Sequence, residues 1–177
     1  MFNDRYGLTA AVLQGRKTMT RRIVPTQYVP MIEDGLQGAA LIEAQRHGDA
    51  FRENEIVAVA QAYNDFYNDE CDPRQFPEGA GWTNKLFVKP DLMPHQIQIT
   101  DINIERLQDI TDEDCKKEGI LTMFTGYCYE YEDKHGFGYR GFSHIKDAFA
   151  SLIDGVSGKG TWQSNPFVFA YSFQLIK

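Results

Sequence analysis

The chain has 177 residues, of which 42% are hydrophobic and 24% are charged, and this length and composition predict one globular domain over residues 1–177. The net charge of −7 argues against a duplex-DNA partner, and three cysteines without a CxxC pair argue against a disulfide framework. No apolar run is long enough to cross a bilayer, so we expect a cytoplasmic protein with no membrane partner.

The first third of the chain contains several predicted elements. Thr9 is expected to cap a short helix that Gly15 terminates. The next segment, 18–23, alternates β-branched and polar residues, which predicts an extended strand. A short element is expected over 36–44, and the apolar run over 55–60 predicts a buried strand.

The rest of the chain predicts two helices and three strands. In the strand over 96–104 the alternation slips near Thr100, which indicates a bulge. Thr111 is expected to cap the first of the helices, and Gly155 to end the second. These elements are an edge strand over 85–89, a strand over 96–104, helices over 109–119 and 145–154, and a strand over 167–175.

The order of these elements predicts an α+β fold. The strands do not alternate strictly with helices, which favours a curved sheet or small β-barrel with about three short flanking helices. Two segments rich in Tyr, Phe, Gly or Pro, 63–84 and 121–142, are interpreted as insertions into this single domain.

The basic residues concentrate near the N-terminus. Residues 1–30 contain five basic residues against one acidic residue, a net charge of +4 that leaves −11 for residues 31–177. A local basic patch on an acidic body suits a small anionic ligand or a short single strand. The four histidines lack HxxxH or HExxH spacing, so we expect no metal site and no cofactor.

The segment Gly15–Arg22 contains four of these cations and two threonines. Arg and Lys side chains in such a set bind phosphate or carboxylate groups. Along a strand, Thr20 and Arg22 point to one face and Arg21 to the other. The alternative is a solvated basic edge strand, because charged edges also discourage sheet aggregation.

Three blocks of the sequence resemble the ASCH domain family. The first is the signature Gly15-x-Lys17-x-x-Thr20-x-Arg22 behind a short helix. The second is RLQDITDEDCKKEG, from Arg106 to Gly119. The third comprises Phe149–Asp154, Trp162 and Asn165-Pro166 before an aromatic strand. The resemblance implies a PUA-like β-barrel related to RNA-binding domains.

The resemblance also implies candidate catalytic residues, because some small members of the family hydrolyse the amide of N4-acetylcytidine. Their catalytic Lys, Thr and Glu match Lys17, Thr20 and Glu118 by position. Thr20 would be the nucleophile, Lys17 its base and Glu118 a residue that positions water or moves a proton. A carboxylate beside Lys17 favours the ammonium form, so either burial outweighs Glu118 or Lys17 is an electrostatic stabiliser and Glu118 the base.

The candidate binding residues are Arg22, Arg21 and Trp162. Arg22 is the expected anion contact on the face of Thr20, while Arg21 is either a second contact or a surface charge. Trp162 either stacks on a base or packs in the barrel. Glu118, near a helix C-terminus, is either a site residue or a solvated surface residue.

Two functions follow from these residues. The first is a module that binds RNA or a modified nucleoside or nucleotide in a cleft lined by the GxKxxTxR segment. The alternative is an amidohydrolase that deacylates N4-acetylcytidine or a similar small N-acylated substrate. The binding function requires only that these residues contact a ligand, without catalysing a reaction, and we rank it first.

Overall fold

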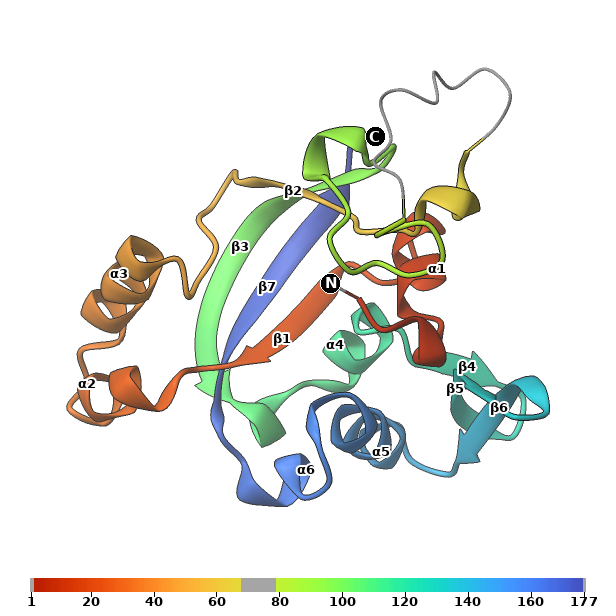
Figure 1. Ribbon diagram of the computed structural model, residues 1–177. Helices are drawn as coiled ribbons and strands as arrows, with labels where there is room; N and C mark the ends of the chain where they lie inside the picture. Colours follow the sequence, from red (N-terminus) through yellow and green to blue (C-terminus); the bar gives the residue numbers. More distant parts are fainter. Residues whose placement is uncertain (1, 68–78, 177) are drawn as a thin grey trace.

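A four-stranded antiparallel sheet of strand order β1-β7-β3-β2 forms the centre of the protein (Figure 1). The computed structural model describes residues 2–67 and 79–176. The sheet curls strongly into a half-barrel, with helices packed around it, so the predicted α+β class with a curved sheet is confirmed. Its strands are β1 (Met19–Ile23), β2 (Ile56–Ala58), β3 (Gln96–Arg106) and β7 (Phe167–Leu175).

The two long strands, β3 and β7, pair along most of their length. Their register shifts between Ile99 and Asp101, at the position where the sequence predicts a bulge. An extra residue in one strand bends the pair and increases its twist. This irregularity therefore contributes to the curl of the sheet.

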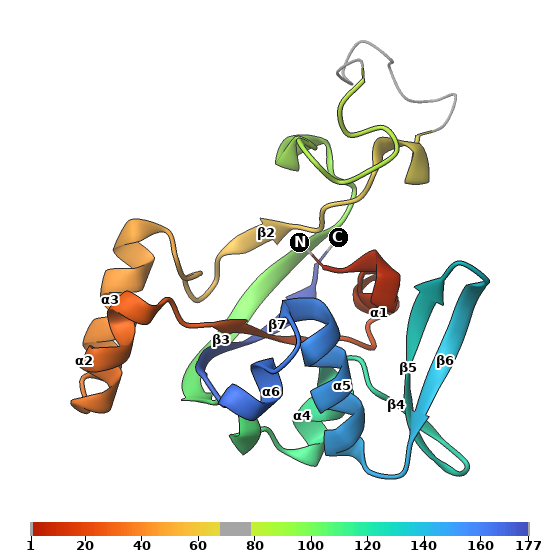
Figure 2. The ribbon, with the colours of Figure 1, turned by 60° about the horizontal axis from the view of Figure 1, so that its bottom comes forward.

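Segment 121–142 folds into a second antiparallel sheet, of order β4-β5-β6. It stands beside α5 at the edge of the molecule (Figure 2). The other segment interpreted as an insertion, 63–84, lies partly outside the described residues. The strands of the second sheet are β4 (Leu121–Met123), β5 (Gly126–Asp133) and β6 (Gly136–Phe142).

Residues 2–67 and 79–176 contain six α-helices, against about three expected. No helix in these ranges is long and apolar enough to span a membrane. The α-helices are α1 (Leu8–Leu13), α2 (Val29–Glu33), α3 (Gln37–His47), α4 (Asp112–Lys117), α5 (Ile145–Ser157) and α6 (Thr161–Ser164). The 3-10 helices are η1 (Asp4–Tyr6), η2 (Thr26–Tyr28), η3 (Tyr63–Asp65), η5 (Pro90–Leu92) and η6 (Leu107–Asp109).

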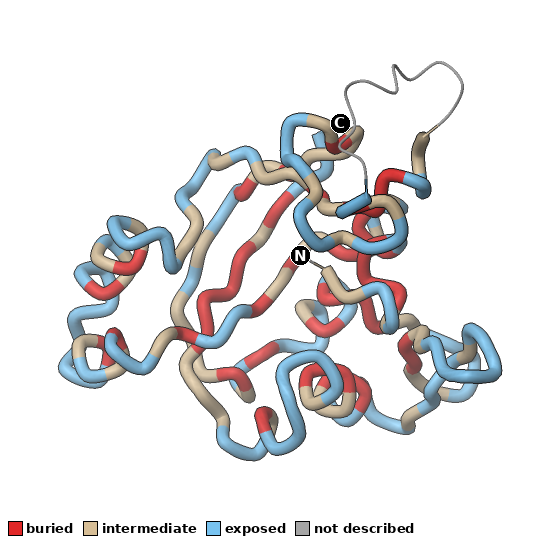
Figure 3. Tube along the Cα trace, in the orientation of Figure 1, coloured by how far each residue is buried: buried red, intermediate tan, exposed pale blue. Residues whose placement is uncertain are grey.

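The sheet has a core on each face because side chains alternate along β7. Phe169 and Tyr171 point into a core shared with α2 and α3, while Val168 points into a core with α4 and α5. Figure 3 shows the buried residues along β7 and on α5. The small residue Ala170, buried on the face of Val168, leaves room there for a long side chain from a neighbouring strand.

Two strand predictions need correction. The strand predicted over 55–60 is reduced to β2 at the sheet edge, where Ile56 is 56% exposed rather than buried. Segment 85–89 forms no strand, because Phe87 adopts a φ of +64° in the left-handed region, which interrupts an extended backbone.

Two helix-terminus predictions are also wrong. Thr9 lies inside α1, whose N-cap is Gly7, and its hydroxyl contacts Lys85 Nζ instead. Gly155 lies inside α5, which continues to Ser157. By contrast, Thr111 caps α4 as predicted, since its hydroxyl accepts a hydrogen bond from the Asp114 amide at 3.1 Å.

Candidate functional site

The start of β1 and the end of α4 are joined by their backbones. The Thr18 amide donates to the Lys117 carbonyl at 2.9 Å, which places the adjacent residues Lys17 and Glu118 side by side. Gly119 then adopts a φ of +107°, which glycine tolerates and other residues rarely adopt, so the chain can turn away after Glu118.

Lys17 and Glu118 form a buried ion pair. Lys17 Nζ lies 2.5 Å from Glu118 Oε2 and donates to the Glu118 carbonyl at 2.9 Å. Lys17 is 2% exposed and Glu118 is 5% exposed. The interpretation of Glu118 as a solvated surface residue is therefore wrong, and the two residues that the family resemblance pairs lie in direct contact.

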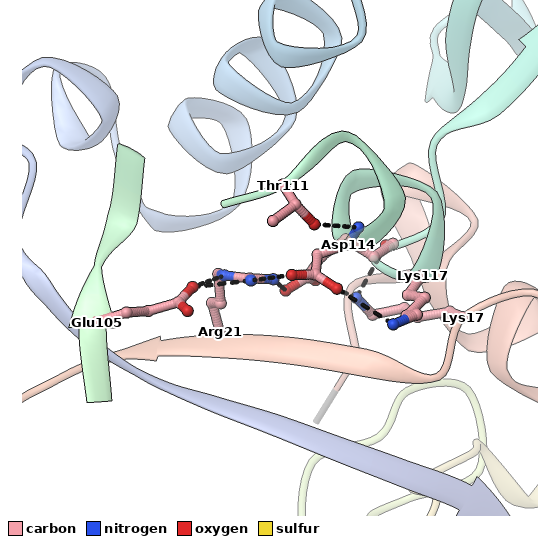
Figure 4. Close-up of polar contacts among 7 residues, drawn as sticks. Lys17, Arg21, Glu105, Thr111, Asp114 and Lys117 are labelled. Carbon is pink, nitrogen blue, oxygen red and sulfur yellow. Dashed lines mark hydrogen bonds and ion pairs between the residues drawn. The ribbon is translucent and has the colours of Figure 1, made fainter. Parts of the chain in front are cut away.

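Arg21, on β1, also contacts this pair. Figure 4 shows its side chain between Glu105 and Asp114. Its Nη1 lies 3.1 Å from Glu118 Oε1, and its Nη2 lies 2.8 Å from Glu105 Oε1 on β3. Nη2 also lies 3.4 Å from Asp114 Oδ2 on α4. The guanidinium reaches Glu105 across β7, where Ala170 lies opposite Arg21 in the register. Arg21 is 6% exposed, so the surface-charge interpretation of this residue is wrong.

The charges of this cluster balance. Asp114 also pairs with Lys117 at 3.2 Å, so three cations face three carboxylates. Arg16, another cation of segment Gly15–Arg22, lies 3.6 Å from Glu130. The cations of segment Gly15–Arg22 therefore do not form an open basic patch, because Arg16, Lys17 and Arg21 are each paired with a carboxylate.

The pKa of Lys17 is lowered from its ordinary value of 10.5. Burial is the largest cause and disfavours the ammonium form, whereas the charge and the hydrogen bond of Glu118 act in the opposite direction. Of the two alternatives for this pair, the structure favours the one in which burial outweighs Glu118. Lys17 therefore loses its proton more readily than an exposed lysine does.

Thr20 lies beside the cluster but is not bonded to it. Within residues 2–67 and 79–176, its hydroxyl makes no hydrogen bond. Thr20 pairs with Tyr171 in the register, and alternation along β1 places its side chain on the sheet face opposite Arg21. The structure therefore brings Lys17 and Glu118 together, while the role of Thr20 as nucleophile stays a prediction.

The other predicted binding residues lie apart from the cluster. Arg22 is exposed on the face of Thr20, with its guanidinium 4.5 Å from the centre of the Phe51 ring. Among the described residues it has no carboxylate partner. Trp162 is half-buried and packs edge-on against Phe149 at 6.0 Å, which supports the packing alternative for this residue. Base or anion contacts by either residue stay predictions.

A small cavity adjoins the ion pair. Its volume is about 40 Å³, enough for a few water molecules but below the roughly 300–1,000 Å³ of ligand pockets. Four residues of α5 form its far wall. The cavity is lined by Leu8, Lys17, Thr20, Arg21, Glu118, Phe149, Leu152, Ile153 and Val156.

A larger pocket of about 520 Å³ lies next to this cavity. The two share Val156 as a wall. Phe2, which lines the larger pocket, also has its ring centre 5.9 Å from Lys17 Nζ. Phe2 and Val156 thus stand between the open pocket, which reaches from η1 to residues 83–86, and the buried ion pair.

Two other site chemistries receive no support from the described residues. Burial raises the pKa of the Cys115 thiol to about 12, so this cysteine is a thiol rather than a reactive thiolate at neutral pH. In residues 2–67 and 79–176, no group of three or more His, Cys, Asp or Glu is placed to hold a metal ion. The three carboxylates near Arg21 instead surround its guanidinium.

Comparisons with protein-family models, with curated proteins and with solved structures find no match for this chain.

Proposed function

We propose that this chain is an ASCH-type domain of PUA-like fold that binds a nucleoside, free or within RNA, at the Lys17–Glu118 site. One observation carries the proposal: a buried ion pair lines a cavity that shares a wall with an open pocket. Perturbed ionisable groups beside a pocket are typical of functional sites. The curled sheet and the three sequence blocks that resemble the ASCH family support the assignment.

The polar groups at the cavity suit the edge of a nucleobase. Lys17 and Arg21 supply donors, and Glu118 supplies acceptors, within one small space. A cytosine edge presents an exocyclic amine that donates, beside ring nitrogen and carbonyl groups that accept. The cluster can therefore satisfy both kinds of group on the same base.

The neighbouring pocket supplies the volume that the cavity lacks. At about 520 Å³ it falls within the range of small-molecule sites. A nucleoside seated there reaches the ion pair once Phe2 and Val156 move aside. The amide side chains of Asn3 and Asn84, which line the same pocket, offer hydrogen bonds to a sugar or base.

Isothermal titration with cytidine and with N4-acetylcytidine tests this proposal. We expect saturable binding that Lys17→Met and Glu118→Gln each weaken at least about tenfold, because each removes one partner of a buried charge pair. Lys116→Met is the matched control, since it removes an exposed pair with Glu113 from the same helix. Absence of binding by the wild-type protein, or equal binding by all variants, would contradict the proposal.

A second candidate function is hydrolysis of the amide of N4-acetylcytidine or a similar N-acylated substrate. The observation that favours it is the lowered pKa of Lys17 in contact with Glu118. Once Lys17 has lost its proton, its amine accepts one from an attacking hydroxyl or water, and Glu118 passes that proton to the leaving amine. The reaction breaks the acyl carbon–nitrogen bond and consumes one water, giving cytidine and acetate.

Acetate release from N4-acetylcytidine tests this activity. Lys17→Met and Glu118→Gln are expected to abolish release, and Lys116→Met to leave it unchanged. Thr20→Val separates two mechanisms: loss of release supports Thr20 as nucleophile, and full release supports direct attack by water. No release at high concentrations of wild-type protein would exclude this candidate while leaving the binding proposal standing.

A further inference from the structure

We infer that a second pocket, on the β5–β6 hairpin, binds the nucleotide adjacent to the one at the Lys17–Glu118 site, so that the ligand is a single-stranded polynucleotide. This inference rests on the proposed function and specifies its ligand. The pocket is called here the Tyr–Arg pocket, and its volume is about 260 Å³. It is lined by Arg5, Tyr6, Tyr129, Tyr131, Asp133 and Arg140.

The Tyr–Arg pocket is built where η1 packs on β5. On the hairpin, Arg140 lies opposite Tyr129 and Gly138 lies opposite Tyr131. Gly138 has no side chain, and the Tyr131 ring lies against the position that its Cβ would occupy, with Cε1 at 3.4 Å. Tyr129 is only 2% exposed, so the accessible groups on this face of the hairpin are the half-buried Tyr131 and the exposed Arg140.

Gly7 fixes the distance between η1 and the hairpin. It adopts a φ of +61°, and a Cβ at this position would overlap the Glu130 carboxylate. A residue without a side chain thus allows β5 to approach the segment that carries Arg5 and Tyr6. Tyr6 in turn packs edge-on against Tyr129, with ring centres 5.9 Å apart, so the pocket wall is held by packing.

The cations of this pocket differ from those of the Lys17–Glu118 cluster. Across the described ranges 2–67 and 79–176, neither Arg5 nor Arg140 forms an ion pair. Both are exposed. Asp133 is the one carboxylate of the lining, and its Oδ1 accepts from the His135 amide at 2.7 Å. Two arginines against one aspartate leave a net positive charge, which suits a phosphodiester.

The pockets form a continuous series. Val156 lines both the cavity at the ion pair and the larger pocket, and Arg5 lines both the larger pocket and the Tyr–Arg pocket. A strand with one nucleoside in the larger pocket therefore directs its next phosphate toward Arg5 and Arg140 and its next base toward Tyr131. Base–aromatic stacking beside cations is the usual way in which single strands are bound without sequence readout.

Fluorescence anisotropy with a labelled short oligocytidylate RNA tests this inference. Arg140 and Tyr131 line the Tyr–Arg pocket but not the larger pocket, and Arg140→Gln and Tyr131→Leu are each expected to weaken RNA binding at least about fivefold. Arg140→Gln is also expected to make the salt dependence shallower by about one phosphate contact. Lys134→Gln, at the turn of the same hairpin, is the matched control and should bind as the wild-type protein does.

Titration with free cytidine separates the two proposals. Arg140→Gln is expected to bind cytidine as tightly as the wild-type protein does, because Arg140 does not line the larger pocket. Cytidine binding with unchanged RNA affinity in both pocket variants would overturn the inference and leave the proposed function intact. If the wild-type protein binds neither cytidine nor the RNA, the proposed function is overturned, and the inference with it. The same anisotropy measurement with an oligodeoxycytidylate shows whether the pocket distinguishes RNA from DNA.

Discussion

Lys17 Nζ lies 2.5 Å from Glu118 Oε2, although 101 positions separate the two residues in the chain. The contact joins the start of β1 to the end of α4 and is nearly inaccessible to solvent. Glu118 also contacts Arg21 through its other carboxylate oxygen, at 3.1 Å. One carboxylate therefore contacts two buried basic side chains. Substitutions of these three residues should for this reason lower the free energy of unfolding by different amounts.

We expect Glu118→Gln to destabilise the protein more than Lys17→Met. The first change leaves Lys17 without a carboxylate partner, and removing one partner of a buried pair costs about 3–5 kcal/mol. The second leaves Glu118 paired with Arg21, so we expect the cost of a lost charged hydrogen bond, about 1.5–3 kcal/mol. Urea unfolding measures both free energies. The reverse order would show that Lys17, not Glu118, is the shared partner.

The lowered pKa of Lys17 predicts a pH dependence of stability. In the unfolded chain Lys17 keeps its ordinary pKa, so above the folded pKa and below 10.5 the unfolded state holds more protons. The free energy of unfolding contributed by this residue should therefore rise with pH across that window and fall as pH drops through the folded pKa.

The difference between the unfolding free energies of the wild-type protein and Lys17→Met isolates this contribution, because other groups such as Cys115 titrate in both proteins. Urea unfolding at several values between about pH 7 and pH 10 should give a difference that increases with pH. A difference that decreases with pH would mean that Glu118 outweighs burial and that Lys17 is held as an ammonium.

Arg21 and its neighbour Arg22 offer a matched comparison. Arg21→Lys replaces a planar fork that reaches three carboxylates with a single ammonium, and we expect a loss of about 3 kcal/mol. Arg22→Lys changes only an exposed contact with Phe51, for which we expect less than about 1 kcal/mol. Chemical denaturation midpoints compare the two variants, and similar midpoints would contradict the assignment of Arg21 to the cluster.

Two helical glycines should respond oppositely to alanine. In α5, a Cβ at Gly155 would overlap the Tyr6 hydroxyl and lie 2.7 Å from its Cζ, so Gly155→Ala should destabilise by about 1–3 kcal/mol. In α3, Gly38 has nothing within 4 Å of that position. Gly38→Ala should therefore stabilise, by up to about 1 kcal/mol. Thermal unfolding of both variants checks this, and a stabilised Gly155→Ala would show that Tyr6 does not pack on α5.

The sequence predicts the central strands well because side chains of different kinds alternate along them, as the two faces of a sheet require. The strand over 18–23, the bulge near Thr100 and the strand over 167–175 all have counterparts in the sheet. Segment 85–89 has a similar composition but turns at Phe87. Composition alone does not distinguish such a turn from an edge strand, because both leave apolar residues exposed.

The sequence predicts only part of the candidate site. Alternation separates Arg21 from Arg22, but both faces of β1 carry charge, so the pattern does not indicate which face is buried. Glu105 and Asp114 are missed because their partner is distant in the chain. A signal exists for Glu105: it alternates with isoleucines and lies on the face of β3 that borders the small residues of β7.

A nucleoside is proposed to bind where Lys17 and Glu118 meet. A 1H–15N NMR titration of the wild-type protein with cytidine tests it most directly. We predict saturable shifts that are largest at the amides of Lys17, Glu118 and Val156, with the α3 amides unmoved. Saturation that leaves those three amides unmoved would show that cytidine binds elsewhere, and no saturable shift would show that it does not bind.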